Sequence, residues 1–243
     1  MRYRHGQDGD TTVTTALIVP SAGSGRRLGS GVPKGLIGLD GVPMVRRTLA
    51  KFAEIPDLIE TVVVVPDTAI AEFNAALANL EFQVGDVRIV AGGASRQVSV
   101  RLGLEALEHD PELVCVHDAA RPLVSRQTLR DVIATARRSG AATAASRPAD
   151  SAREELVSGG TRVLDRKRLW MIETPQAFAY EILRKAHRTA KAMRFQATDD
   201  AALVEESGHE VTIIESSGLN RKITGPEDLA LARLLISRAE PRR

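Results

Sequence analysis

The stretch ALIVPSAGSGRRLGSGVPKGL, residues 16–36, decides the fold, because in it a short apolar run opens directly into a glycine-rich loop. The run at 16–19 is apolar on both faces of an extended chain, which is typical of a parallel strand covered by helices on each side. Comparable runs follow at 62–65, 87–90, 113–116 and 141–145. Because helical patterns separate these runs, we predict an α/β fold with a mostly parallel, Rossmann-like sheet flanked by helices.

Two of the predicted helices carry clear end signals. Ser125 is a good N-cap for a helix that ends near Gly140. Thr224 and Glu227 fit a capping box with proline inside the first turn, which predicts a helix from there through Leu235.

Composition narrows the classes of function. The 243-residue chain has a net charge of +2 and only 3% aromatic residues, so nothing favours a nucleic-acid partner. No apolar stretch approaches the roughly 20 residues of a membrane span, and the first 15 residues lack the apolar core of a secretory signal. We therefore predict a disordered leader at 1–15 and one domain at 16–238, with neither a nucleic-acid nor a membrane partner.

The cysteine content bears on the compartment. Cys115 is the single cysteine, so no internal disulfide is possible and a reducing, cytoplasmic setting is predicted. It lies within an apolar run and is interpreted as a small buried hydrophobe rather than a reactive thiol. The five histidines show no metal-ligand spacing with one another or with Cys115.

The glycine-rich loop differs from the two best-known phosphate loops. A Walker loop needs glycine before its lysine and serine or threonine after it, whereas Lys34 stands between Pro33 and Gly35. A dinucleotide fingerprint needs a third glycine where this chain has Leu28, and its helix should start at once. Here glycines and prolines delay the helix until about residue 44.

What remains is a strand followed by a long loop with three cations, Arg26, Arg27 and Lys34. Glycines let backbone N–H groups approach an anion closely, and strand carboxyl ends are where open α/β sheets bind ligands. Arginine clamps oxygens in a fork and lysine acts as a mobile point charge, which suits a triphosphate. The alternative is an arginine-rich surface loop without a ligand.

Two further motifs follow predicted strands. In HDAARP, residues 117–122, Asp118 is placed to hold Mg²⁺ and Arg121 to neutralise a phosphate. The alternative for Asp118 is a turn or N-cap residue, and His117 is interpreted as a packed neighbour. In AGGASRQVSV, residues 91–100, two glycines allow close backbone approach and Ser99 offers a hydroxyl to a base edge.

The remaining signals are weaker when each is taken alone. Lys222 in NRKIT is another candidate phosphate partner. Asp199 or Asp200 in TDDAAL has a simple structural explanation, a negative charge at a helix N-terminus. Residues 147–168 are polar, with a Ser-Gly-Gly turn between strand-like pieces. This segment is either a solvated hairpin or an arm that reaches a neighbouring subunit, and periodicity does not choose between them.

Together and in this order, these pieces resemble the 2-C-methyl-D-erythritol 4-phosphate cytidylyltransferases, within the wider group of sugar- and polyol-phosphate nucleotidyltransferases. The matching stretches are PSAGSGRR with PK, GGASRQVSV, VHDAARP, DSAR, LDRKRLW, TPQAF, TDDA and NRKIT. Their joint order makes the resemblance specific. It implies a fold of the nucleotidyltransferase type with a protruding β-arm at 147–168.

The resemblance also implies a reaction. CTP and methylerythritol phosphate give the cytidine diphosphate polyol and pyrophosphate, with Mg²⁺, in the non-mevalonate isoprenoid pathway. The polyol phosphate attacks the α-phosphorus directly, which agrees with a sequence that has no G-x-S-x-G elbow and no Cys/His pair. By the same resemblance Arg27, Lys34 and Lys222 are catalytic, and Asp118 binds the metal.

Binding residues are carried over from the family in the same way. Those implied for the nucleotide are Ala22, Gly23, Gly25, Gly93, Ala94 and Ser99. Those implied for the acceptor are Asp118, Arg121, Ser151, Arg166 and Thr198. Since the family's arm crosses to the partner subunit, the resemblance implies a homodimer through 147–168.

The chain departs from the family pattern at several positions, one of them mild: the family's D-T-[IM]-K is here DSAR at 150–153, which keeps a hydroxyl and a positive charge. Leu219 stands where many members have a metal-binding Asp, and Gly35 stands where Gln usually follows P-K. Glu173 replaces the Gln before T-P-Q, and Ser21 replaces an alanine. Two alternatives stay open: a ribitol 5-phosphate cytidylyltransferase, which shares almost every motif, and a non-catalytic nucleotide-binding relative.

Overall fold

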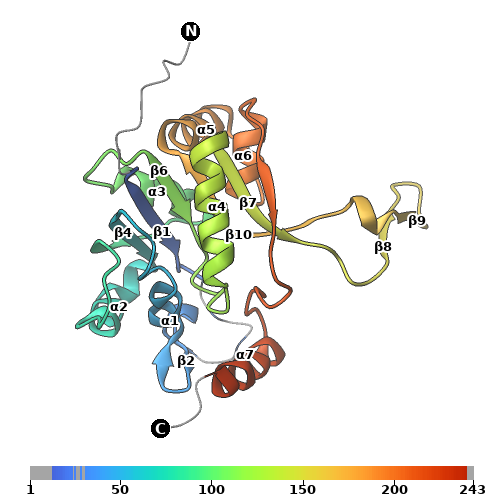
Figure 1. Cartoon of the computed structure of the whole chain (residues 1–243). Helices are drawn as coiled ribbons and strands as arrows, with labels where there is room; N and C mark the ends of the chain where they lie inside the picture. The colour runs from blue at the N-terminus through green and yellow to red at the C-terminus, as the bar shows by residue number, and fades with distance from the viewer. Residues whose placement is uncertain (1–12, 24, 26–27, 29–30, 240–243) are drawn as a thin grey trace.

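A seven-stranded sheet forms the centre of the computed structural model, which describes residues 13–23, 25, 28 and 31–239 (Figure 1). The strand order is β11-β7-β10-β6-β1-β4-β5. The bounds are β1 Thr15–Pro20, β4 Leu58–Val65, β5 Asp86–Ala91, β6 Leu113–Val116, β7 Ala141–Ser146, β10 Met171–Ala179 and β11 Thr212–Glu215. Strand β10 runs antiparallel to β6 and β7, and all other pairs are parallel. The predicted mostly parallel α/β fold is therefore confirmed.

Helices cover both faces of this sheet. Their bounds are α1 Met44–Ala50, α2 Ile70–Leu77, α3 Arg96–Glu105, α4 Arg126–Ser139, α5 Tyr180–Met193, α6 Asp200–Glu206 and α7 Pro226–Ala239. Short 3₁₀ turns are η2 Lys34–Leu36, η3 Asp67–Ala69 and η4 Arg166–Arg168. Helices α1, α2 and α4 pack on one face, and α3, α5 and α6 on the other. Among the described residues, no helix combines the length and the apolarity needed to cross a membrane.

Successive side chains of a strand point alternately to the two faces of the sheet, which explains why both faces are covered. In β1, Leu17 and Val19 belong to one core cluster, whereas Ile18 between them belongs to the other. All three side chains are fully buried. An apolar run of this kind must be covered on both faces, since successive side chains point to opposite sides of a strand. Each of the five predicted apolar runs forms a strand of the sheet.

Strands β10 and β11 were not predicted. The buried part of β10 contains the polar side chains of Glu173, Thr174 and Gln176, so it lacks an apolar run. Each of these side chains has at least one hydrogen-bond partner far away in the chain, which a local pattern does not reveal. Their contacts matter for the cavity described below.

The ends of α4 are as predicted. Ser125 caps the helix, because its Oγ accepts a hydrogen bond of 3.0 Å from the backbone N–H of Thr128. Gly140 follows the last turn with φ of 85°, in the left-handed region where glycine carries no steric cost.

The predicted start of α7 requires a correction. The carboxylate that accepts hydrogen bonds from Thr224 is that of Asp228 and not that of Glu227. Asp228 Oδ2 accepts from the backbone N–H of Thr224 at 2.8 Å and from its hydroxyl at 2.6 Å. The reason is that the helix begins at Pro226, which makes Asp228 its third residue. The helix also extends to Ala239, beyond the predicted end at Leu235.

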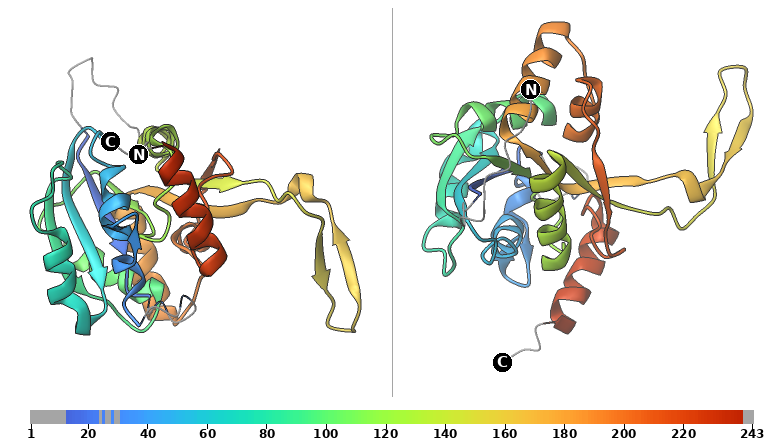
Figure 2. Two further views of the ribbon diagram at one scale, coloured as in Figure 1. Left: turned by 90° about the horizontal axis from the view of Figure 1, so that it is seen from below. Right: turned by 45° about the horizontal axis from the view of Figure 1, so that its top comes forward.

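The polar segment predicted at 147–168 forms a hairpin that projects away from the sheet (Figure 2). Strands β8 Ala152–Glu155 and β9 Thr161–Leu164 pair antiparallel and lie outside the main sheet. At its base, the Arg147 guanidinium carbon lies 3.4 Å from the centre of the Trp170 ring. The hairpin is joined to the body by β7 and β10, so two neighbouring strands carry it.

The described part of the chain begins at residue 13, inside the leader predicted at 1–15. Strand β1 already begins at Thr15, whose N–H donates to the carbonyl oxygen of Asp57 at 2.9 Å. The carbonyl oxygen of Val13 accepts from Arg137 Nη2 at 3.1 Å. Residues 1–12 lie outside the described part of the chain.

Candidate active site

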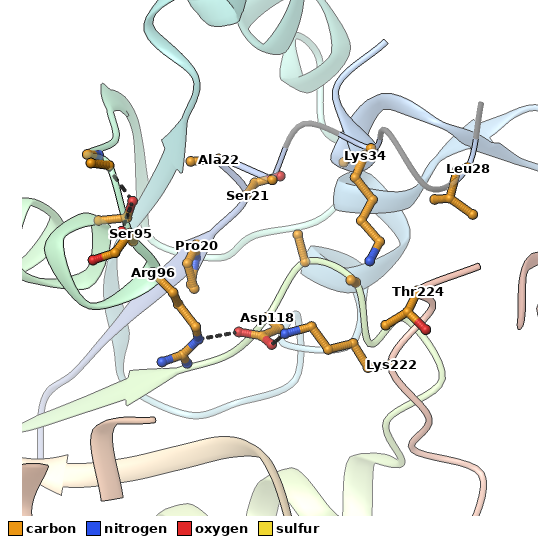
Figure 3. Close-up of a pocket in the computed structure, with 18 residues that line it drawn as sticks. Pro20, Ser21, Ala22, Leu28, Lys34, Ser95, Arg96, Asp118, Lys222 and Thr224 are labelled. Carbon is orange, nitrogen blue, oxygen red and sulfur yellow. Dashed lines mark hydrogen bonds and ion pairs between the residues drawn. The ribbon is translucent and has the colours of Figure 1, made fainter. Parts of the chain in front are cut away.

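A cavity of about 570 Å³ opens at the carboxyl edge of the sheet, where the loops after β1, β5 and β6 meet residues 222–224. Parallel strands bring these loops to one edge although they are far apart in sequence. Nine predicted site residues line the cavity: Ala22, Gly23, Gly25, Lys34, Gly93, Ala94, Ser99, Asp118 and Lys222. Figure 3 shows the amino end of Lys34 directed toward the side where Asp118 and Lys222 meet.

The other predicted residues lie elsewhere. Arg27 falls outside the described residues. Arg121 Nη1 donates to the carbonyl oxygen of Asn220 at 2.6 Å, and burial lowers the pKa of the Arg121 guanidinium despite the nearby carboxylates of Asp118 and Glu173. Thr198 is exposed just before α6. Ser151 and Arg166 lie at the base of the β8–β9 hairpin.

Ser151 and Arg166 flank the paired end of the hairpin. Ser151 directly precedes β8 and Arg166 begins the turn after β9, and the paired residues nearest them are Ala152 and Leu164. Arg166 Nη1 donates to the carbonyl oxygen of Ala149. Neither Ser151 nor Arg166 lines the cavity of its own chain.

Asp118 is held between two cations at the floor of the cavity (Figure 3). Its Oδ1 lies 2.9 Å from Nε of Arg96, and its Oδ2 lies 2.5 Å from Nζ of Lys222. Burial by itself would raise the pKa of this carboxyl, but the charges of Arg96 and Lys222 outweigh burial and hold the pKa well below its usual range. Asp118 is therefore a carboxylate at neutral pH.

Arg96 is a charged residue of the cavity lining that the sequence analysis did not identify as a site residue. Its Nη1 lies 2.7 Å from Oδ2 of Asp200, so the guanidinium spans two carboxylates. Burial would lower the pKa of Arg96, but Asp200 and Asp118 together raise it. The residue lies within the quoted stretch at 91–100, yet its partners are 22 and 104 residues away.

Glycines let two loops approach each other beside Ser99. A Cβ at Gly92 would lie 2.8 Å from the Ala22 methyl group, and one at Gly93 would lie 2.1 Å from Cγ1 of Val98. The Ser99 hydroxyl is buried, accepting from Gly93 N–H at 3.1 Å and donating to the Ser95 carbonyl at 2.9 Å. Ser99 thus shapes the loop after β5 in this structure.

The turn that carries Lys34 is fixed to the end of β1. The backbone N–H of Lys34 donates to the carbonyl oxygen of Gly23 at 3.2 Å, and Gly25 takes a positive φ of 65°. Gly35 is buried against Ser21: a Cβ at Gly35 would lie 2.2 Å from the Ser21 Oγ. Two departures from the family pattern, Ser21 and Gly35, therefore fit each other.

Glu173, a third departure, holds the segment that leads to Lys222. This buried carboxylate accepts from Ser146 Oγ at 2.8 Å, Ser216 Oγ at 2.6 Å and Asn220 Nδ2 at 2.8 Å. Three donors satisfy a carboxylate that would otherwise be costly to bury. Leu219, the fourth departure, is 54% exposed, and its side chain contributes no oxygen.

The donor set fits a cation that arrives with phosphate. Mg²⁺ is usually held by one or two carboxylates together with substrate phosphates and water. Asp118 supplies one such carboxylate, and two lysines on the same cavity supply partners for the phosphates. Within the described residues, no cluster of three or more His, Cys, Asp or Glu side chains could hold a metal by itself.

His117 is a packed neighbour, as predicted. It is fully buried, with its ring 5.3 Å from that of Phe52 in an edge-to-face arrangement. Its Nε2 lies 3.1 Å from the carbonyl oxygen of Arg121, which only accepts, so the neutral ring carries its proton on Nε2. Burial lowers the pKa of His117 to about 4. Cys115 is likewise fully buried, and burial raises the pKa of its thiol.

A mostly parallel sheet with a glycine-rich loop, two lysines and a carboxylate at its carboxyl edge defines a nucleotide-binding α/β protein of the nucleotidyltransferase type. The chain belongs to the 2-C-methyl-D-erythritol 4-phosphate cytidylyltransferase family, whose model matches residues 15–238. This confirms the resemblance drawn from the motifs.

Individual relatives agree with the family assignment. The chain is 41% identical over 229 residues to the 2-C-methyl-D-erythritol 4-phosphate cytidylyltransferase of Syntrophus aciditrophicus, covering 93% of this chain and 97% of that protein. The crystal structure of the enzyme of that name from Thermus thermophilus is 34% identical, with a TM-score of 0.74 over 91% of this chain and 98% of that one. The 4-diphosphocytidyl-2C-methyl-D-erythritol synthase structure from Anaerococcus prevotii has the same fold, with a TM-score of 0.83 at 24% identity over 95% of this chain and 100% of that one.

The fit between Ser21 and Gly35 predicts a substitution with a specific rescue. Gly35→Ala should lower the free energy of unfolding by about 1–3 kcal/mol, because the new methyl group overlaps the Ser21 Oγ. Chemical denaturation measures this loss. Ser21→Ala in the same chain should recover part of it, because the overlap with the Ser21 hydroxyl is removed while the contacts at 3.0 Å with the Phe73 ring remain. The buried Ser21 hydroxyl has no hydrogen-bond partner among the described residues, so its removal costs little. Equal stability of Gly35→Ala and wild type would contradict the predicted fit.

The lowered pKa of His117 predicts a pH dependence of stability. Between the unfolded pKa of 6.5 and the folded pKa of about 4 the unfolded chain binds the extra proton, so stability is lost as the pH falls through this window. The loss should be on the order of 3 kcal/mol. Denaturation at pH 7, 5.5 and 4.5 measures it. His117→Gln removes this titration and should flatten the profile; parallel profiles would refute the assignment.

Proposed function

We propose that this protein transfers the cytidylyl group of CTP to 2-C-methyl-D-erythritol 4-phosphate, giving 4-diphosphocytidyl-2-C-methyl-D-erythritol and pyrophosphate in isoprenoid biosynthesis. The observation that carries the proposal is the joint lining of one cavity by Lys34, Lys222 and Asp118 in a chain of this family. A loop of close-packed backbone beside them supplies a surface for the nucleotide base.

The reaction needs charge neutralisation and positioning rather than an enzyme nucleophile. A phosphate oxygen of the acceptor bonds to the α-phosphorus of CTP while the bond to the leaving pyrophosphate breaks, so no proton transfer from a side chain is required. Negative charge accumulates on the phosphate oxygens, and nearby cations stabilise it. Lys34 and Lys222 fill this role in the proposal, together with Arg27.

We assign the cofactor Mg²⁺ to Asp118. When bound, such a cation neutralises phosphate oxygens and polarises the reacting phosphorus. Asp118 is suited to hold it because the carboxyl remains ionised and faces the cavity. With Leu219 in place of the family's second carboxylate, the triphosphate and water supply the remaining ligands.

The two substrates take opposite sides of this carboxylate in the proposal. The nucleotide side consists of Ala22, Gly23, Gly25, Gly93, Ala94 and Ser99, all of which line the cavity. The acceptor side consists of Asp118, Arg121, Ser151, Arg166 and Thr198. Ser151 and Arg166 lie at the base of the projecting hairpin and do not line the cavity of their own chain, so in this proposal a second copy of the chain supplies them.

We therefore propose a homodimer in which each hairpin completes the acceptor site of the partner. The hairpin presents Val157 and Val163 to solvent at 111% and 61% exposure, which suits a surface that is covered on association. We also propose a cytoplasmic location, in keeping with a single, fully buried cysteine.

Pyrophosphate release tests the activity. The wild type should release pyrophosphate from CTP with Mg²⁺ and 2-C-methyl-D-erythritol 4-phosphate, and Lys34→Ala should reduce kcat by roughly 10²–10³-fold because it removes a fixed charge from the transition state. Arg101→Gln, at a surface pair with Glu105, is the matched control and should leave turnover unchanged. Release with ribitol 5-phosphate alone would assign a different acceptor. Binding of CTP without turnover on either acceptor would indicate a non-catalytic relative.

Complementation tests whether the hairpin acts in the partner subunit. Lys34→Ala and Arg166→Ala should each be impaired as homodimers, but their mixed dimer contains one site with both residues intact. Co-expression should therefore recover about a quarter of wild-type activity, given random pairing of the two chains. Activity no higher than the average of the two variants would place Arg166 outside the partner's site.

A further inference from the structure

Arg96 joins the cavity to the interior of the protein through a chain of ion pairs and hydrogen bonds. Asp200 is fully buried, and its Oδ1 lies 3.0 Å from Nε2 of the buried His187 on α5. Its Oδ2 lies 2.7 Å from Nη1 of Arg96, whose Nε in turn lies 2.9 Å from Oδ1 of Asp118. The contacts run from α5 through α6 and α3 to the end of β6.

The far end of this chain is fixed in place. The backbone N–H groups of Asp200 and Ala201 donate to Oε1 of Gln176 at 3.1 and 3.2 Å, which ties the start of α6 to β10. A planar guanidinium that is held by two carboxylates at different nitrogens cannot rotate without breaking one pair. Arg96 is consequently a rigid partner for Asp118.

The two oxygens of Asp118 therefore have unlike partners. Oδ1 faces a cation that is anchored in the interior, whereas Oδ2 faces Lys222, whose flexible side chain is 40% exposed. The two carboxylates, Asp118 and Asp200, balance the two cations, Arg96 and Lys222. If Lys222 leaves Asp118, another cation must replace it, because an uncompensated buried carboxylate is costly.

We propose that Arg96 is a positioning residue that occupies Oδ1 of Asp118 and so leaves the single oxygen Oδ2 for exchange. Without nucleotide, Oδ2 binds Lys222; with nucleotide, Lys222 turns to the phosphates and Oδ2 becomes available to the accompanying divalent cation. The inference rests on the proposed function, which supplies the triphosphate and the cation.

This arrangement has a consequence for metal selectivity. Mg²⁺ is small and demands near-ideal octahedral geometry, whereas Ca²⁺ accepts a carboxylate through one oxygen or both. A carboxylate restricted to one oxygen favours Mg²⁺ over Ca²⁺. Releasing Oδ1 from Arg96 should therefore weaken the preference for Mg²⁺.

Calorimetric titration of CTP at graded Mg²⁺ or Ca²⁺ concentrations tests this role. In Arg96→Lys the charge remains, but one ammonium group does not span both carboxylates in the guanidinium geometry. The Mg²⁺ concentration that half-saturates CTP binding should rise roughly 10-fold, as for other residues that orient a metal ligand, while the Ca²⁺ requirement changes less. Arg101→Lys on the same helix is the matched control and should match the wild type in both.

Asp200→Asn provides a second variant that leaves Asp118 and its direct contacts in place. This substitution removes the anchor of Arg96. The ratio of the Ca²⁺ to the Mg²⁺ concentration needed for CTP binding should therefore shift in the same direction as in Arg96→Lys. Asp200→Asn becomes the deciding variant if Arg96→Lys does not fold. If the folded variants keep the wild-type ratio of the Ca²⁺ to the Mg²⁺ requirement, the proposal is overturned. It is also overturned if the variants bind fewer CTP molecules per chain but keep the wild-type ratio. Because CTP binding is measured without acceptor, a wild type that binds CTP but releases no pyrophosphate refutes the proposed function and not the role of Arg96.

Discussion

The balance of charge around Asp118 is the constraint on which the rest of the site depends. A carboxylate this deeply buried persists only if cations and hydrogen bonds compensate its lost hydration. Arg96 and Lys222 compensate the carboxylate, and the Thr174 hydroxyl holds the backbone of Asp118 by accepting from its N–H at 3.0 Å. Each of these partners comes from a different part of the chain, so the site exists only in the folded protein.

The scaffold positions those partners by satisfying other buried polar groups. Glu173 on β10 accepts from three donors, one of them Asn220, two residues before Lys222. Asn220 also donates to the Thr174 carbonyl at 2.8 Å. The antiparallel strand β10 thus links the Asp118 carboxylate and the lysine that pairs with it, although neither belongs to that strand.

The departures from the family pattern are of two physical kinds. Ser21 with Gly35, and Glu173 with its three donors, are matched within this chain by groups that occupy the same space or satisfy the same charge. Leu219 has no such match, because its exposed side chain offers no oxygen. The difference is one of location: packed positions must be compensated for the protein to fold, whereas an exposed position changes only the chemistry available to a ligand.

The sequence by itself determined five of the seven strands, the helices α4 and α7 and the edge where the cavity lies, because strand burial and helix ends depend on residues close together in the chain. It also identified Lys34, Asp118 and Lys222 as candidate site residues, since the motifs that carry them have a recognisable order, and all three line the cavity. Only the tertiary structure revealed Arg96, the polar strand β10 and the use of Asp228 as the cap of α7. The physical reason is that ion pairs and buried hydrogen bonds join residues up to 104 positions apart, and their energy depends on distances that no local pattern specifies.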